Sequence, residues 1–233
     1  VTALGYEKSN LETPADVTVY SGEDLKKTGA NDVANALKYK AGVYFTQMGP
    51  HDQSFITGNS TLSLRGIKGG TLVLINGVPA SFNNVSHLDM MNLDTVEKVE
   101  VVKGGGAVLY GSEAYGGVIN VITKSEYKNS LHIAAGNKGQ RDYSATISAG
   151  KLGVTLGRNE MGETGILTQK QGTKTINGVR VPYYTGFGDS KKDHLGVSYK
   201  FDDKLSFNYM FDKKKYTIDY LGADNSKLQH FDY

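Results

Sequence analysis

The sequence has no cysteine, no tryptophan and only four prolines among its 233 residues. The absence of cysteine excludes disulfide bonds, thiolate metal sites and cysteine nucleophiles. No apolar run approaches the roughly 18 residues that a transmembrane helix requires. The scarcity of proline excludes a proline-rich linker, whereas the 29 glycines indicate many turns and bulges.

Neither sign of charge is in large excess. The chain has 26 Lys and Arg residues against 24 Asp and Glu residues, a formal net charge of +2. A nucleic-acid partner usually requires a basic stripe, and this balance gives no reason to expect one. The chain begins at Val1 with no signal peptide, so we expect a mature or trimmed sequence.

The chain up to about residue 126 mixes short helices with short strands. Ser21 stands three residues before Asp24, a spacing like that of a helix capping box, and Asn31 is expected to cap a second helix. Asn76-Gly77 is a strong turn signal. This mixture favours a small α+β domain. The expected strands are Val17–Tyr20, Thr71–Ile75, Val99–Val102 and Val118–Ile122.

After residue 126, apolar and polar residues alternate with a period of two, as in half-buried strands. Tight turns are expected at Gly150-Lys151 and Asp202-Asp203, and residues 157–193 are expected to form a long polar connection. Short turns alternating with long loops are typical of outer-membrane barrels, and the 15 tyrosines fit an aromatic girdle. A soluble β-sandwich shows the same alternation. The apolar positions include Tyr143–Ala149, Leu152–Leu156, Leu195–Phe201, Leu205–Phe211 and Tyr216–Tyr220.

Three sequence blocks in the first half occur in a characteristic order and spacing. They are Ser63–Ile67 with Thr71–Pro79, then Val96–Gly104, then Ala107–Ala114 with Gly116–Thr123. Together they resemble the plug domain of TonB-dependent outer-membrane receptors. One departure is Gly105, where the family usually has proline.

The resemblance implies an α+β plug domain over residues 1–126, followed over residues 127–233 by N-terminal antiparallel strands of a transmembrane β-barrel. Barrels of this family have about 22 strands of about 10 residues each. The 107 residues from 127 to 233 provide about six strands, so we expect an incomplete barrel, a fragment of a larger one. A split receptor completed by another chain is the alternative.

The resemblance also assigns roles to particular residues. Arg65 matches an arginine that locks the plug to carboxylates of the barrel, whereas a plain turn arginine would pair with Glu97 or Glu100. Val1-Thr2-Ala3 resembles the end of the TonB box, which binds the partner TonB by strand addition.

The cargo is expected to bind at two plug loops, residues 47–59 and 80–87. Histidines in these loops suit haem iron, and aromatic and polar side chains suit a ferric siderophore; cobalamin remains open. Exposed loop histidines can equally be ordinary surface residues. The candidate ligand residues are His51, Asp52, Phe55, Phe82, Asn83, Asn84 and His87.

No catalytic constellation is evident, because Ser112-Glu113 has no histidine nearby in the sequence. Gly104–Gly106 lacks the Gly-Lys-Ser/Thr of a nucleotide-binding loop. We therefore expect no enzyme, no intrinsic cofactor and no directly bound metal. The resemblance implies a receptor in the Gram-negative outer membrane that imports a siderophore or haem with energy from TonB and its inner-membrane complex. Import of cobalamin, or a non-transporting binding or signalling receptor, is the alternative.

Overall fold

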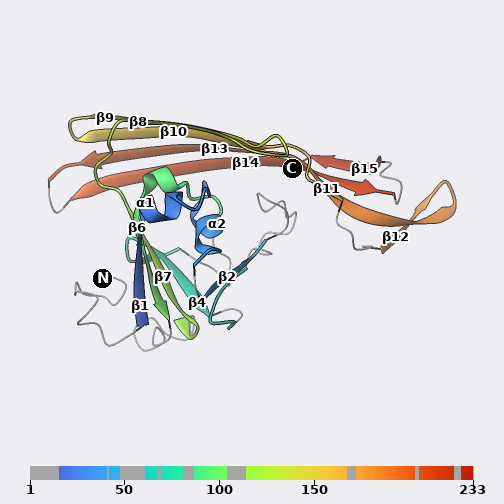
Figure 1. Cartoon of the computed structure of the whole chain (residues 1–233), viewed down its shortest axis with the longest axis horizontal. Coiled ribbons are helices and arrows are strands. Elements are labelled where there is room, and N and C mark those ends of the chain that lie inside the picture. The colour runs from blue at the N-terminus through green and yellow to red at the C-terminus, as the bar shows by residue number, and fades with distance from the viewer. Residues whose placement is uncertain are drawn as a thin grey trace.

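A computed structural model describes residues 16–40, 42–47, 61–67, 70–80, 87–103, 114–166, 172–202, 205–222 and 227–232. These residues form a small α+β domain and a broad antiparallel sheet, which we call the wall (Figure 1). The small domain lies against one face of the wall, with its helices between the two sheets (Figure 1). Within these residues, no helix is both long and apolar enough to span a membrane.

The small domain is built on a five-stranded sheet that contains all four predicted strands. In this sheet β4 (Thr71–Ile75) and β7 (Gly117–Thr123) are parallel, and the other neighbouring strands are antiparallel. Asn76 and Gly77 have φ values of +51° and +82° in the turn between β4 and β5, as predicted. The strand order is β1 (Asp16–Ser21), β6 (Val96–Lys103), β7 (Gly117–Thr123), β4 (Thr71–Ile75) and β5 (Val78–Pro79); β2 (Val43–Thr46) and β3 (Thr61–Leu64) pair separately.

Three short helical segments pack on this sheet: α1 (Gly22–Lys26), α2 (Val33–Leu37) and the 3₁₀ segment η2 (Leu93–Thr95). The cap of α1 is confirmed, because the Ser21 hydroxyl accepts the Asp24 N–H at 3.1 Å. The prediction that Asn31 caps α2 is wrong by one residue. The Asp32 carboxylate accepts the Asn35 N–H at 2.8 Å and is the cap. Both helices contribute to one core, whose fully buried members include Leu25, Val33, Leu37, Leu64, Val99 and Ile119.

The wall is antiparallel throughout, in agreement with the predicted fold class of an α+β plug followed by barrel strands. Its edge strands, in the described part of the chain, are β8 (Ser130–Ala135) and β15 (Lys227–Asp232). The domain boundary at residue 126 falls between β7 and β8 and stays a prediction. The order is β15 (Lys227–Asp232), β14 (Ser206–Leu221), β13 (Val179–Lys200), β10 (Leu152–Met161), β9 (Arg141–Ala149) and β8 (Ser130–Ala135), with β11 (Gly165–Ile166) and β12 (Gly172–Ile176) also paired to β13.

The expectation that residues 157–193 form a polar connection is wrong. Strand β10 continues to Met161, and β13 runs for 22 residues from Val179. Asn177 and Gly178, with φ values of +49° and +80°, turn the chain between β12 and β13. The wall therefore extends well past the small domain as a long hairpin (Figure 1).

The two faces of the wall differ in polarity. Register places Ala145, Leu156, Leu195 and Phe211 side by side in one apolar row. Further large apolar side chains are exposed on the same face, which gives a continuous apolar belt. The opposite, inner face is polar or small and meets the small domain. The exposed side chains of the belt include Leu131, Ile133, Ile147, Leu152, Tyr199, Phe207 and Tyr209.

Candidate functional site

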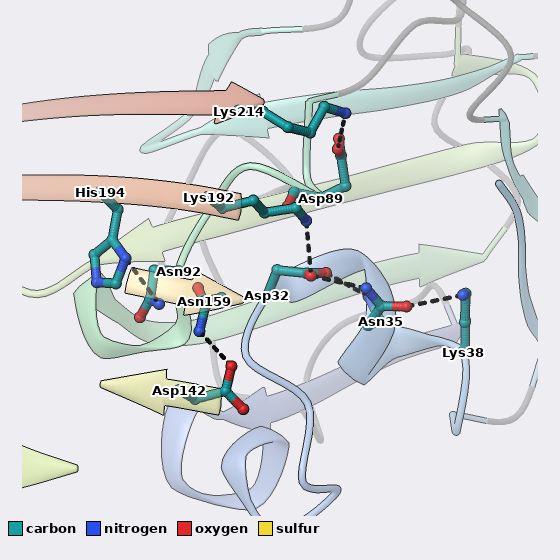
Figure 2. Close-up of polar contacts among 10 residues, drawn as sticks. All are labelled: Asp32, Asn35, Lys38, Asp89, Asn92, Asp142, Asn159, Lys192, His194 and Lys214. Carbon is teal, nitrogen blue, oxygen red and sulfur yellow. Dashed lines mark hydrogen bonds and ion pairs between the residues drawn. The ribbon is translucent and has the colours of Figure 1, made fainter. Parts of the chain in front are cut away.

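The small domain meets the inner face of the wall through charged and polar side chains (Figure 2). Lys192 of β13 donates to the Asp89 carbonyl oxygen at 2.7 Å, and its Nζ lies 3.4 Å from Asp32 Oδ2. Lys214 of β14 lies 3.4 Å from the Asp89 carboxylate. The Lys192 side chain is only 8% exposed, so these oxygen partners replace the water that the buried ammonium group loses. Two wall lysines thus hold the start of α2 and the turn that follows residue 87.

Asp94 connects three elements at the same contact. Its Oδ1 is 2.7 Å from Lys26 Nζ on α1, and its Oδ2 accepts a hydrogen bond from the Ser144 hydroxyl on β9. Burial by itself would raise the pKa of Asp94, but the bonds from Lys26 and Ser144 outweigh burial and hold the pKa below its ordinary value. Asp94 is therefore ionised at neutral pH.

Asn92 and His194 form a second cross-contact. The Asn92 Oδ1 accepts the Asp94 N–H at 2.7 Å as the cap of η2, so its Nδ2 faces His194 Nδ1 at 3.4 Å (Figure 2). This geometry favours the neutral imidazole in which Nδ1 accepts. The ring covers Gly157 on the neighbouring strand, where a Cβ would lie 1.9 Å from the ring.

The segment that joins the two sheets, residues 124–129, is also fixed to the wall. The Ser198 hydroxyl donates to the Ser125 carbonyl at 3.0 Å, and Lys200 pairs with Glu126 at 2.6 Å. Tyr127 packs over Gly153, where a Cβ would lie 2.0 Å from its ring. Burial raises the pKa of Tyr127 to about 12, so its hydroxyl stays protonated.

The structure gives Arg65 a partner that the sequence did not reveal. Its Nη2 lies 2.8 Å from Asp16 Oδ2, and both side chains are about half exposed. Glu100 is fully buried on β6 and pairs with Lys98 at 3.0 Å, and Glu97 on the same strand is exposed. The lock between Arg65 and the barrel stays a prediction.

Most of the predicted ligand and partner residues lie outside the described residues. His87 is described and is exposed, two residues before Asp89. It therefore adjoins the contact between the two sheets. Those outside the described residues are His51, Asp52, Phe55, Phe82, Asn83 and Asn84 of the ligand set and Val1, Thr2 and Ala3 of the TonB contact.

Sequence reasoning missed the residues that carry this contact. Lys192 and His194 fall at inward positions of β13, but the sequence predicts a polar connection up to residue 193. Asp32 is the N-cap of α2 and Asp89 belongs to a turn, and only the folded protein brings both to Lys192.

Comparison with known proteins gives a consistent set of relatives. The model of the TonB-dependent receptor plug domain matches residues 9–118. The vitamin B12 transporter BtuB of Vibrio cholerae is 29% identical over 98% of this chain, and the hemin receptor of Yersinia enterocolitica is 34% identical over 77%. The chain spans 38% and 26% of their lengths, respectively.

A solved structure shares the fold at low identity. The ferripyoverdine receptor of the outer membrane of Pseudomonas aeruginosa superposes with a TM-score of 0.60 at 14% identity. The superposition covers 98% of this chain and 30% of that receptor.

Proposed function

We propose, from the premise that this chain belongs to the TonB-dependent receptors, that it forms the plug and the first wall strands of an energy-coupled importer in the Gram-negative outer membrane. The observation that carries the proposal is the two-faced wall, apolar outside and polar where it meets the small domain. A barrel as wide as those of this family leaves an aqueous lumen that has to be filled. A folded domain held by polar contacts fills it and can still be remodelled.

The cargo that we propose is a ferric siderophore or haem, bound as substrate and not as a resident cofactor. The hemin receptor among the relatives supports this class. Cobalamin is the second candidate, because the vitamin B12 transporter matches nearly the whole chain. We further propose that TonB and its inner-membrane complex supply the energy, and that the protein binds and imports without catalysis.

Deletion of the complete gene tests the proposal. The deletion strain should lose growth on one chelate as sole iron source, or lose cobalamin-dependent growth, and a plasmid copy should restore it. Normal growth on every siderophore, haem and cobalamin tested would instead favour a non-transporting surface receptor.

A spectroscopic titration of the full-length receptor in detergent then tests haem as the cargo. A shift of the Soret band that His51→Ala or His87→Ala removes, and that the control His132→Ala keeps, would identify haem. The absence of a shift in a folded receptor would leave siderophores and cobalamin.

A further inference from the structure

Both ring nitrogens of His230 on β15 face carboxylates. Asp219 Oδ1 of β14 lies 2.5 Å from Nδ1 of the ring, and Asp232 Oδ1 of β15 itself lies 3.2 Å from Nε2. A neutral imidazole carries one N–H and can donate to only one of the two carboxylates, whereas the imidazolium donates to both. The geometry therefore matches the protonated ring.

The carboxylate on β14 is buried and takes its partners from the next strand. The Asp219 side chain is only 1% exposed, and its Oδ2 lies 3.0 Å from Lys227 Nζ. Buried charges require donors in place of water. Because Lys227 and His230 both belong to β15, the pairing of β14 with β15 brings the carboxylate and its donors together.

This group of charges lies beyond the apolar belt. Along β14, Phe211 of the belt is followed on the same face by Lys213 and Lys215, since side chains alternate, and Asp219 comes later still. Charged side chains are unfavourable in the lipid core and nearly neutral at its interfaces. The His230 side chain is about half exposed. Its ring can therefore exchange protons with water.

Other charged groups around His230 act in both directions. Lys227 disfavours the charged ring, and Asp189 of β13 and Glu163, which precedes β11, are close enough to favour the charge of Lys227. The hydrogen bond with Asp219 has the largest effect and raises the pKa of His230 above its ordinary value. The charged residues that line the surface hollow beside Asp232 are Arg141, Glu160, Asp189, Lys191 and Lys215.

The residue that follows His230 belongs to an aromatic cluster on the opposite face of β15. The Phe231 ring packs edge-on against Tyr220 with ring centroids 5.0 Å apart, and Tyr220 packs on Tyr183 at 4.7 Å. Lys174 Nζ of β12 lies 4.2 Å from the centroid of the Tyr220 ring. Four strands thus meet at this cluster, and β15 contributes Phe231 to it.

We propose that His230, with Asp219 and Asp232, forms a proton-operated clasp, which holds the end of β15 against β14 when the ring is protonated and releases it when the ring is neutral. Release also separates Phe231 from Tyr220, so the proton on one face decides whether the aromatic cluster on the other face is complete. This inference concerns control of the long hairpin and does not rest on the proposed function.

The direction of the pH dependence follows from the raised pKa of His230. A group whose pKa is higher in the folded protein stabilises it fully below the ordinary histidine pKa of about 6.5, and this stabilisation is lost as pH rises through the raised value. The clasp is therefore closed in mild acid and open in mild alkali.

The test measures hydrogen exchange of residues 227–232 in the full-length receptor in detergent at pH 5.5 and pH 8.5. Labelling times are scaled so that the intrinsic exchange is equal. The wild type should exchange these amides at least about threefold faster at pH 8.5, because two charge-assisted hydrogen bonds are weakened. His230→Gln should exchange at the faster rate at both pH values. The matched control His132→Gln removes another exposed histidine, on β8, and should keep the wild-type difference.

Nuclear magnetic resonance of the histidine rings gives the protonation midpoint directly. The His230 signal is assigned by its absence in His230→Gln, and its midpoint should lie above 6.5 and fall in Asp232→Asn. A midpoint at or below 6.5, equal wild-type exchange at both pH values, or a pH difference that His230→Gln keeps would overturn the proposal. If His230→Gln does not assemble, Asp232→Asn, at a side chain 80% exposed, is the exchange test and should show a smaller pH difference than the wild type.

Discussion

At the scale of single residues, the contact between plug and wall depends on buried charges that are each given partners. Asp94 has Lys26 and Ser144, and Lys192 has Asp32 and the Asp89 carbonyl. Because an isolated buried charge costs several kcal/mol, removing one partner while the two parts stay in contact should be destabilising. The contact therefore requires matched polar groups from the small domain and from the wall.

Acid should weaken the contact through Asp94. Its pKa in the folded protein is lowered, so its stabilising effect is complete above the ordinary carboxyl pKa of about 4 and is lost as pH falls through the lowered value. Asp94→Asn should therefore lower the thermal midpoint of the full-length receptor at pH 6, with the difference from wild type shrinking below about pH 4.

Asp24→Asn is the matched control for this pH dependence. Asp24 also has a lowered pKa, through hydrogen bonds with Lys27 and Ser21, but it is exposed on α1. Its removal should change the midpoint little. A difference for Asp94→Asn that stays constant from pH 6 to pH 3 would contradict the assigned role.

Contacts between residues close together in the sequence could be predicted from it, whereas contacts between residues far apart in the sequence could not. Ser21 was identified as a cap because the cap and its N–H are three residues apart. The pairing of Arg65 with Asp16 spans 49 residues and depends on how β1 and the turn after β3 are placed. The same limit hid Asp89 and Lys192, which are 103 residues apart.

At the scale of elements, α2 is a five-residue helix whose start is tied to the wall. Helices this short are unstable alone, so the cap and the tertiary contact decide whether α2 forms. Asp32 supplies both, since its Oδ1 accepts the Asn35 N–H and its Oδ2 faces Lys192.

Two substitutions at Asp32 separate these effects. Asp32→Asn keeps a capping oxygen and loses the charge, whereas Asp32→Ala loses both. Amide hydrogen exchange of residues 33–37 in the full-length receptor should rise in the order wild type, Asn, Ala. Loss of the cap alone contributes about 1 kcal/mol, or about fivefold faster exchange. Equal exchange in all three proteins would show that α2 is held by its buried apolar side chains alone.

The sequence of β13 explains why a polar connection was predicted where the structure has a strand. In its apolar part, Leu195, Val197 and Tyr199 alternate with small or polar residues and predict a strand. Nearer its start, Lys191 and Lys192 are adjacent and face opposite sides, so both faces are polar and the alternation disappears. The remaining local signal in this stretch is Asn177-Gly178, a dipeptide that indicates a hairpin turn.

At the scale of the whole molecule, the plug packs against one face of a wall whose other face is apolar (Figure 1). The structural class of each half was predictable, because short capped helices and the alternation of apolar and polar residues are patterns of the local sequence. The individual residue pairs that hold the plug on the polar face were not predictable, since they join parts of the chain that are far apart in the sequence.

A disulfide placed across the contact tests this arrangement. The Asp94 and Ser144 side chains meet, and this chain has no native cysteine. In the full-length receptor, Asp94→Cys with Ser144→Cys should lose both free thiols on mild oxidation. Asp24→Cys with Ser144→Cys, which places one thiol on the exposed side of α1, should keep them. Free thiols in the first pair in a folded receptor would contradict the packing of η2 against β9.

Two glycines of the inner face have a consequence for how closely the layers of the molecule approach each other. Tyr127 occupies the space over Gly153, and Thr95 occupies the space over Gly196, where a Cβ would lie 2.8 Å from its methyl group. A side chain at either glycine would overlap these groups and hold the small domain and its connecting segment away from the wall. The distance between the two layers is thus set by two positions that carry no side chain.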